Sequence, residues 1–414
     1  MAGVLLLAAT ARPLVGQQSL PPGSAIPGAE LTVLLMTMGP GERVWERFGH
    51  NAIWVQDRLR GTSLAYNFGL FSFQQENFAL RFLQGRMRYW MEGFDALPYA
   101  ETYVRDRRSV WVQELELPPQ ARLALRDFLE WNQRPENRFY RYEYYRDNCS
   151  TRVRDVLDRA LGGRIRRQTE TVMTGTTYRF HTSRLTAADP PVATGLLLLV
   201  GPDADRELSA WEEGFVPEKL RQHLRLVTVP GPDGRPVPLV KAERALSAAD
   251  AFPVPGSPPD WLPAFLMGGI VIGGAIALSG QLGPRQLWAR MSFVGLAGVW
   301  TLLTGIVGLV LTGLWTLTDH TIAYWNQNLF QANLFALGLL FLAGPLARGA
   351  AWARRPARGL AVLVAALSVA GLLAKLLPVM PQGNGPIIAL MLPANLGLAW
   401  GTWQVALPRT RPSA

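Results

Sequence analysis

The stretch FVGLAGVWTLLTGIVGLVLTGLWTL, at residues 293–317, decides the architecture of this chain. It contains no charged residue and is longer than the roughly 20 residues that a helix needs to cross the hydrocarbon core of a bilayer. One such stretch could be a buried core helix. The chain has five in succession, however, which predict an all-α bundle of about five transmembrane helices over 261–407, with spans at 261–280, 293–317, 328–347, 359–378 and 386–407.

Basic residues between these spans indicate how the bundle is oriented. Arginines lie between the first and second spans, between the third and fourth, and after the fifth: Arg285, Arg290, Arg348, Arg354, Arg355, Arg358, Arg409 and Arg411. The other two loops, 319–326 and 381–385, contain neither lysine nor arginine. Because basic loops remain in the cytoplasm, we expect a cytoplasmic C-terminus and an extracytoplasmic location for the residues before Trp261.

The net charge of +10 does not by itself indicate a nucleic-acid-binding protein. Nearly all of the basic residues are arginines that alternate with acidic residues or lie beside apolar runs, and no nucleic-acid-binding motif is present. A basic surface beside anionic lipid headgroups explains the same charge. We therefore expect membrane lipid, rather than nucleic acid, as the partner, and we expect neither a metal nor a cofactor.

The part of the chain before the bundle divides into three regions. Residues 1–20 contain a short apolar run that resembles a signal peptide or signal anchor. Residues 28–228 are expected to form a soluble domain, and the proline- and glycine-rich residues 229–260 a linker. Within the domain, apolar patterns predict strands and one helix, at Leu31–Met38, Ala52–Val55, Leu64–Phe68 and Val110–Leu117 for the strands and Pro118–Trp131 for the helix.

The segment around Cys149, the only cysteine, is the most informative part of this domain. A chain with one cysteine has no intrachain disulfide, so the residue is either a buried structural side chain or a functional thiol. In Asp147-Asn148-Cys149-Ser150-Thr151, Asp147 or Asn148 can serve as a helix N-cap, and apolar residues follow at helical spacing until Gly162-Gly163. Cys149 is therefore expected in the first helical turn, where unpaired N–H groups and the helix dipole favour a thiolate.

A thiol at a helix start becomes a nucleophile when an imidazole can take its proton. His50 is the best placed of the four histidines, because it lies at the start of a predicted strand in Phe48-Gly49-His50-Asn51-Ala52. Asn67, on the following strand, is the candidate that orients the imidazole, although an asparagine facing a turn would give the same pattern. Tyr145 and Asn148 flank the cysteine and could bind an oxyanion, or equally serve as a packing residue and a helix cap.

At these residues the chain resembles the Lnb family of lipoprotein N-acyltransferases. The resemblance rests on Met38-Gly39-Pro40-Gly41, Phe48-Gly49-His50-Asn51-Ala52, Tyr66-Asn67-Phe68-Gly69-Leu70-Phe71, Tyr145-Arg146-Asp147-Asn148-Cys149-Ser150, and Asp319-His320 followed by Asn326, Asn328 and Asn333. The soluble domain also resembles permuted papain-like (NlpC/P60-type) thiol enzymes, in which the histidine strand precedes the cysteine helix. The expected fold class is therefore an α+β permuted papain-like extracytoplasmic domain followed by the transmembrane bundle.

The resemblance implies a thiol-dependent acyltransferase of the bacterial inner membrane, with a periplasmic catalytic domain. Cys149 is the implied nucleophile and His50 the implied base. The enzyme would move an acyl chain from a phospholipid, through a cysteine thioester, to the α-amine of a diacylated lipoprotein. His320, Asn326 and Asn328, in an outer loop, could bind a headgroup or the lipoprotein amine, although polar residues at a membrane boundary are often only interfacial.

Two other functions remain compatible with the sequence. A papain-like core would equally suit a cell-wall amidase or peptidase, although such an enzyme has no evident need for five spans. A non-enzymatic membrane scaffold would make Cys149 a structural residue. Turnover of phospholipid would identify the acyltransferase, and cleavage of a muropeptide would identify the amidase. A Cys149→Ser variant that folds and still fully complements the null strain would favour the scaffold.

Overall fold

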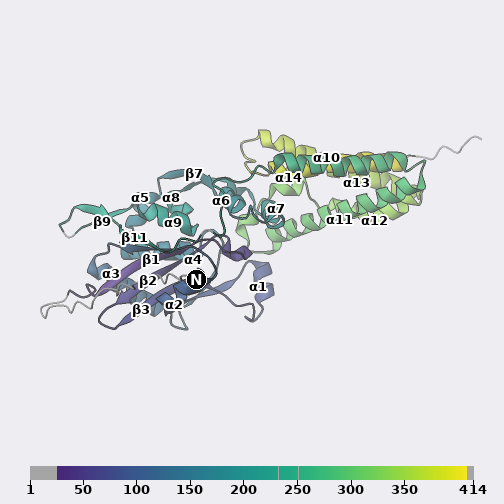
Figure 1. Cartoon of the computed structure of the whole chain (residues 1–414). Helices are drawn as coiled ribbons and strands as arrows, with labels where there is room; N and C mark the ends of the chain where they lie inside the picture. Colours follow the sequence, from purple (N-terminus) through teal and green to yellow (C-terminus); the bar gives the residue numbers. More distant parts are fainter. Residues whose placement is uncertain (1–25, 232, 250, 408–414) are drawn as a thin grey trace, which may run out of the picture.

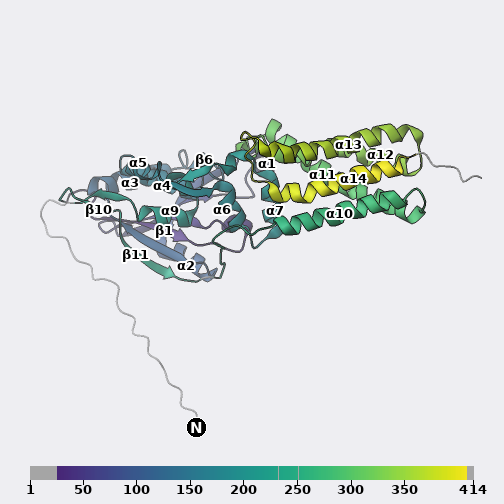
Figure 2. The ribbon, with the colours of Figure 1, turned by 90° about the horizontal axis from the view of Figure 1, so that it is seen from above.

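The computed structural model describes residues 26–231, 233–249 and 251–407. The predicted targeting segment 1–20 and the arginines Arg409 and Arg411 lie outside the described residues. A mixed α/β part and a bundle of long helices lie end to end, as the two perpendicular views in Figures 1 and 2 show. The two parts are therefore in contact only through the elements at their facing ends.

A seven-stranded antiparallel sheet forms the centre of the α/β part, in the order β11-β5-β1-β2-β3-β4-β6. Its strands are β1 Leu31–Met38, β2 His50–Asp57, β3 Thr62–Leu70, β4 Arg88–Asp95, β5 Val110–Leu115, β6 Phe139–Arg141 and β11 Val240–Ser247. The central strand β1 is apolar along almost its whole length, because both of its faces are buried. The strand predicted at Leu31–Met38 is confirmed, and those predicted near residues 52, 64 and 110 are confirmed within a few residues.

Helices cover both faces of this sheet. On one face lie α3 (Pro119–Asn132), α4 (Cys149–Ala160) and α9 (Pro217–Leu224), which bury leucine and valine side chains against β1 to β4. On the other face lies α2 (Ala96–Arg105), which packs Ala96 and Ala100 against the sheet. Each fully buried leucine or valine contributes roughly 1.5–3 kcal/mol, so α4 is held firmly with its first turn at the edge of the core.

Several short elements complete the α/β part. They are α1 Phe78–Gln84, α5 Arg164–Thr169, β7 Met173–Thr177, α6 Tyr178–Leu185, α7 Pro190–Leu199, β8 Glu207–Ser209, α8 Ala210–Glu213, β9 Thr228–Pro230 and β10 Pro236–Pro238. The strand pairs β7–β8 and β9–β10 each form a small separate sheet. α7 is a short apolar helix next to the bundle (Figure 1).

The predicted linker at 229–260 is wrong for its central part. Val240–Ser247 forms β11, which pairs with β5 at the edge of the main sheet, and β10 also lies in this region. The sequence VKAERALS carries Lys241, Glu243 and Arg244, and half of its residues are exposed. Charged side chains are typical of edge strands, where they protect unpaired backbone groups. Because of them, this segment lacks the apolar pattern from which strands were predicted.

Within the described ranges, five helices are long and apolar enough to cross a membrane: α10 Leu262–Leu282, α11 Leu287–Leu317, a segment Gln327–Ala347 that ends in α12 (Phe335–Ala347), α13 Ala351–Leu373 with a short extension, and α14 Gly385–Val405. α10 and α14 pack closely through glycines. A Cβ atom at Gly273 would lie 2.3 Å from the carbonyl oxygen of Pro393, and one at Gly280 would lie 2.3 Å from Cα of Gly401. Small residues at such positions let membrane helices approach each other.

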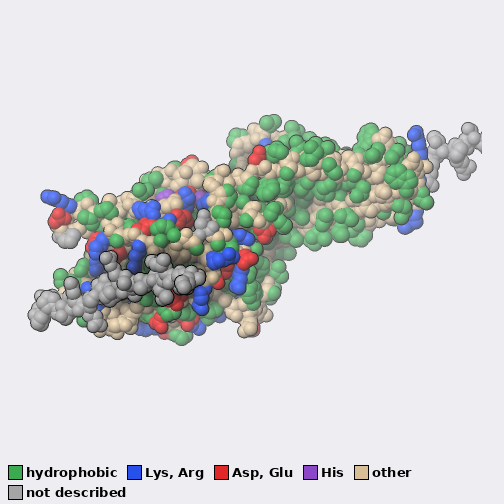
Figure 3. Space-filling view, viewed as in Figure 1, with side chains coloured by type: hydrophobic (Ala, Val, Ile, Leu, Met, Phe, Trp, Pro, Cys, Tyr) green, Lys and Arg blue, Asp and Glu red, His purple; other side chains and the backbone are tan. Residues whose placement is uncertain are grey.

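Several arginines that were predicted to lie in loops between the membrane spans lie within helices instead. α11 and α13 begin earlier than predicted, so Arg290, Arg354, Arg355 and Arg358 lie within the N-terminal parts of helices rather than in loops. The charged residues interrupted the apolar runs, but a helix continues through a membrane boundary without difficulty. Basic side chains are visible at the end of the bundle that points away from the α/β part (Figure 3).

Candidate active site

The first turn of α4 is fixed by a reciprocal cap. The side-chain oxygen of Asn148 accepts hydrogen bonds from the N–H groups of Ser150 and Thr151, both at 2.9 Å, and the hydroxyl of Thr151 accepts one from the N–H of Asn148 at 2.8 Å. The predicted N-cap is therefore confirmed, and Cys149 is the first helical residue. A cap of this kind stabilises a helix by about 1 kcal/mol and sets the direction of its first side chain.

Ser150 connects this helix start to the strand that carries His50. Its hydroxyl donates to the carbonyl oxygen of Gly214 at 2.6 Å and accepts a hydrogen bond from the side-chain amide of Asn51 at 3.1 Å. Asn51 directly follows His50 in β2, and both Ser150 and Asn51 are fully buried. The distance between Cys149 and His50 is thus fixed by their sequence neighbours rather than by a direct hydrogen bond.

His50 is hydrogen-bonded to Asn67, the candidate partner named from the sequence. The ring nitrogen Nε2 of His50 lies 2.6 Å from the side-chain oxygen of Asn67, which belongs to the neighbouring strand β3. An amide oxygen can only accept, so Nε2 donates and the neutral ring keeps an unprotonated Nδ1. This tautomer can accept a proton.

Gly69 shows how closely the cysteine and the histidine approach. A Cβ atom at Gly69 would lie 3.3 Å from Cβ of Cys149, 3.7 Å from Cε1 of His50 and 3.9 Å from the hydroxyl of Tyr140. Gly69 also has φ +102°, which favours glycine. The three side chains therefore converge on residue 69, where their close approach is possible because glycine has no side chain.

Burial controls the charge state of the pair. Desolvation raises the pKa of the Cys149 thiol to about 11, while the backbone N–H groups of Asn51 and Ser150 act in the opposite direction. Desolvation also lowers the pKa of His50 to about 4, against the hydrogen bond to Asn67, which raises it. The prediction of a resting thiolate is therefore wrong: the helix start favours the anion, but burial outweighs it, and both groups are neutral near pH 7.

Several residues around the thiol were missed in the sequence. Tyr89, Tyr140 and Tyr142 surround it, and burial raises the pKa of Tyr89 to about 12 and those of Tyr140 and Tyr142 well above the usual value, with the thiolate charge a further cause. The hydroxyl of Tyr140 is buried without a hydrogen-bond partner in the described structure. The clustering of tyrosines in Phe139–Tyr145 was visible, but only the sheet brings Tyr89 and Tyr140 together.

A buried arginine is a second missed residue. Arg108 donates to the carbonyl oxygen of Gly39 at 2.9 Å and lies over the ring of Tyr103, which in turn stacks on His50. Its charge adds to the lowering of the His50 pKa and opposes the desolvation that raises the pKa of Cys149. Arg108 follows a turn outside the matched motifs, and nothing in its local sequence distinguished it from other surface arginines.

Tyr145 and Asn148 do not face the thiol as oxyanion-binding residues. The Tyr145 hydroxyl is hydrogen-bonded to Thr182 at 2.9 Å, and its ring packs on Tyr178 and Phe215. The Asn148 amide is used in the cap and in donating to backbone carbonyls. Of the two readings that the sequence allowed, the structure supports packing residue and cap.

His320 lies in the outer loop and contacts the α/β part rather than a free surface. Its Nε2 donates to the carbonyl oxygen of Phe82 at 2.9 Å, and its ring stacks on Tyr144. Beside it, Asp319 forms ion pairs with Arg86 at 2.7 Å and Arg141 at 3.5 Å. His320, predicted to bind a headgroup or the lipoprotein amine, is therefore part of the contact between the α/β part and the outer loops of the bundle. We call this contact the joint.

Asn326 and Asn328 are also structural. Their side-chain amides donate to the carbonyl groups of Leu197, Leu198 and Leu199 at the end of α7, with distances of 2.8–3.1 Å. Their side-chain oxygens accept hydrogen bonds as well, from Gln382 and Asn384 respectively. The prediction that these amides bind substrate is wrong for the described structure, because terminal carbonyls of a buried helix need donors and take them first.

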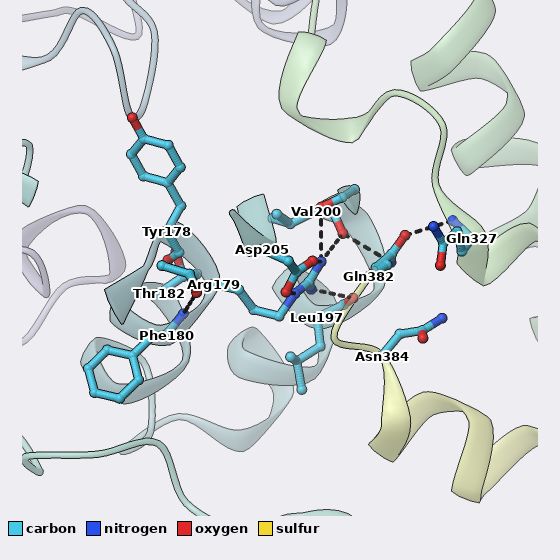
Figure 4. A network of polar contacts seen from close by, with 12 residues as sticks. Tyr178, Arg179, Phe180, Thr182, Leu197, Val200, Asp205, Gln327, Gln382 and Asn384 are labelled. Carbon is cyan, nitrogen blue, oxygen red and sulfur yellow. Dashed lines mark hydrogen bonds and ion pairs between the residues drawn. The ribbon is translucent and has the colours of Figure 1, made fainter. Parts of the chain in front are cut away.

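Figure 4 shows a neighbouring part of the same joint. Arg179 forms an ion pair with Asp205 at 2.8 Å and donates to the carbonyl oxygen of Val200, which also accepts from Gln382. Gln382 in turn accepts from the backbone N–H of Gln327 at 2.7 Å. Side chains of the α/β part and of two membrane loops thus form one network, which fixes the orientation of the bundle relative to the sheet.

Among the described residues, no group of three His, Cys, Asp or Glu side chains is arranged to hold a metal ion. Comparison with protein families gives one match: residues 24–184 match the Lnb N-terminal periplasmic domain. Nothing among curated proteins or solved structures matches the chain. The matched region contains the sheet strands β1 to β6, Cys149, His50 and Asn67. Residues 24–184 are therefore similar to the Lnb N-terminal periplasmic domain, and in the part of the chain that the structure describes they are followed by five helices long and apolar enough to cross a membrane.

Proposed function

We propose that this protein is a thiol-dependent acyltransferase that moves an acyl chain from a phospholipid to the α-amine of a diacylated lipoprotein. The observation that carries the proposal is the close approach of Cys149 and His50 at Gly69, together with the hydrogen bond between His50 and Asn67. The domain that holds them is joined directly to five membrane helices. The order of a histidine strand before a cysteine helix supports a permuted papain-like active site.

The first half of the reaction forms a thioester. Nδ1 of His50 takes the proton of the Cys149 thiol as the sulfur attacks the ester carbonyl carbon of the phospholipid. The backbone N–H groups at the start of α4 and the unpartnered hydroxyl of Tyr140 stabilise the oxyanion that forms. The intermediate then collapses, the ester C–O bond breaks, and the imidazolium returns the proton to the departing lysophospholipid.

The second half transfers the acyl group. The neutral α-amine of the lipoprotein attacks the thioester carbonyl, and His50 accepts the proton that the nitrogen loses. The C–S bond breaks, and the imidazolium protonates the departing sulfur. The neutral resting pair suits both steps, because the neutral imidazole is present at physiological pH and the thiol loses its proton only as the new bond forms.

The membrane half places this chemistry next to its substrates. We propose that the protein lies in the bacterial inner membrane with its C-terminus in the cytoplasm, in agreement with the basic end of the bundle opposite the periplasmic domain (Figure 3). Both the phospholipid and the diacylated lipoprotein are then anchored in the leaflet that borders the α/β part. A soluble amidase would gain nothing from this arrangement.

The test is reconstitution of the purified full chain in liposomes with a diacylated lipopeptide. We expect release of lysophospholipid, formation of a triacylated peptide, and a thioester on Cys149 that mass spectrometry detects when the lipopeptide is omitted. The Cys149→Ala variant should form none of these products while keeping the thermal stability of the wild type. Cleavage of muropeptides without lipid turnover would instead identify a cell-wall amidase, and lipid turnover by Cys149→Ala would reject the thioester.

A further inference from the structure

Aromatic rings lead away from the active site directly after Gly69. Phe71, two residues further along the chain, stacks on Tyr89 with ring centres 5.1 Å apart and meets Phe73 at 5.2 Å. Phe73 meets Phe78, the first residue of α1, at 5.1 Å. Tyr89 itself is one of the tyrosines that surround the thiol. The rings thus form a continuous row from Tyr89, beside Cys149, to α1.

The path continues along α1 to the membrane helices. Phe78 stacks on Phe82 at 6.3 Å, and Phe82 meets His320 at 6.5 Å, three residues after the end of α11. The backbone N–H of Asp319 donates to Gln84 at 2.8 Å, so α1 is bound to the outer end of the bundle. Figures 1 and 2 both show α1 on the side of the α/β part that faces the helices.

The outer side of this path is exposed and apolar. Phe73 is 63% exposed and Leu83 is 65% exposed, and Trp45, Leu80 and Phe82 are also exposed. A contiguous group of large apolar side chains on a soluble surface marks an interaction site. Leu317 and Trp325, which flank the loop residues that contact α1, are exposed in the same way, and a tryptophan at this position is typical of a membrane interface.

We propose that the aromatic strip, defined as Trp45, Phe71, Phe73, Phe78, Phe82 and Leu83, lies in the outer leaflet and conducts a phospholipid acyl chain to Cys149. We assign lipid to this strip because the strip is continuous with the lipid-facing end of α11. Lipid can then cover its exposed apolar side chains without a second protein. Contact with the bilayer stands on the geometry alone. Delivery of the acyl chain rests on the proposed function.

Site-directed spin labels test the bilayer contact independently of catalysis. Cys149 is the only cysteine, so a Cys149→Ala background accepts one label at a time, at Phe73→Cys or Leu83→Cys. In liposomes, we expect labels at both positions to be relaxed more by oxygen, which dissolves in lipid, than by a water-soluble nickel chelate. Leu59→Cys and Leu226→Cys are matched controls, because these leucines are 68% and 76% exposed and should show the opposite ratio.

Leu59 lies in the turn between β2 and β3, and Leu226 lies between α9 and β9. Strand β9 is at the end of the α/β part opposite the bundle (Figure 1). A water-like ratio at both Phe73→Cys and Leu83→Cys would overturn the proposed bilayer contact. The four labels together therefore decide whether the strip, rather than the whole α/β part, meets the lipid.

Activity tests the delivery of the acyl chain. The double variant Phe73→Ser, Leu83→Ser should lower turnover of bilayer phospholipid at least tenfold more than turnover of a water-soluble short-chain ester. The control Leu59→Ser should change neither rate. Equal losses on both substrates, or no loss on bilayer phospholipid, would overturn delivery along the strip. Absence of turnover by the wild-type protein on either substrate would instead count against the proposed function, while the label result would still decide the bilayer contact.

Discussion

The surroundings of Cys149 and the joint around Asn328 are both polar clusters beside a membrane bundle, but they use their polar groups differently. Beside Cys149, the Tyr140 hydroxyl is buried without a partner, and the neutral His50 ring keeps a free Nδ1. At the joint, Asn326 and Asn328 donate to the last carbonyls of α7 and accept from further amides. Asn326 and Asn328 are thus used in holding α7, whereas the groups beside Cys149 remain available to a substrate.

The largest expected effect is the loss of enzymatic activity when His50, the proposed base, is removed from the cluster around Cys149. His50→Ala is expected to lower lysophospholipid release by about 10²- to 10⁴-fold, because the thiol then loses its proton only to water. His223→Gln is the matched control, since His223 lies outside the site and donates to Glu213, and glutamine keeps a donor there. Activity of His50→Ala close to that of His223→Gln would show that the Cys149–His50 pair is not the catalytic one.

The pH dependence of Cys149 alkylation tests whether the pKa of the thiol is raised by burial. The pKa of the Cys149 thiol is raised to about 11, so the reactive thiolate is scarce at pH 7 and increases as the pH rises. The rate of alkylation by iodoacetamide should therefore increase about tenfold per pH unit between pH 7 and 10. Mass spectrometry of the cysteine peptide after timed exposure measures this rate. A rate that levels off by pH 8 would mean that the helix start, rather than burial, controls the thiol.

The smallest effect is expected at the joint. Asn328→Ala removes donors to the Leu197 and Leu198 carbonyls and the acceptor for Asn384, so it should lower the free energy of unfolding by about 1–3 kcal/mol. Thermal unfolding in detergent, followed by tryptophan fluorescence, measures the change. Asn333→Ala is the control, because the buried amide of Asn333 has no partner in the described structure and its loss should not destabilise the protein. Equal losses in the two variants would contradict a structural role specific to Asn328.

Local sequence patterns predicted those elements that depend on one signal alone, such as an apolar run or a helix cap. β1 is a continuous apolar run and occupies the predicted residues, and α4 begins at its predicted cap because Asn148 has both the side chain and the spacing that a helix start requires. The five membrane helices follow from length and apolarity alone. Their ends were less predictable, because α11 and α13 extend through arginines that end an apolar run without ending a helix.

Partners distant in the chain could not be predicted in the same way. β11 reaches the sheet through pairing with β5, and its charged residues gave no apolar signal. Whether Asn326 and Asn328 bind substrate or hold α7 depends on where the carbonyls of Leu197 and Leu198 lie, and local sequence carries no information on that position. Arg108 was missed for the same reason: only the fold places it near the thiol.

The sequence by itself determined the membrane bundle, the central strand, the capped helix that begins at Cys149, and the pairing of His50 with Asn67 as candidates. Each of these depends on apolar length, on spacing along one segment, or on residue types whose chemistry is known. The tertiary structure alone decided the charge state of the pair, because burial rather than helix position sets the pKa values of Cys149 and His50. It also decided which outer-loop amides are free, because hydrogen bonds between distant segments form only after the two halves pack together.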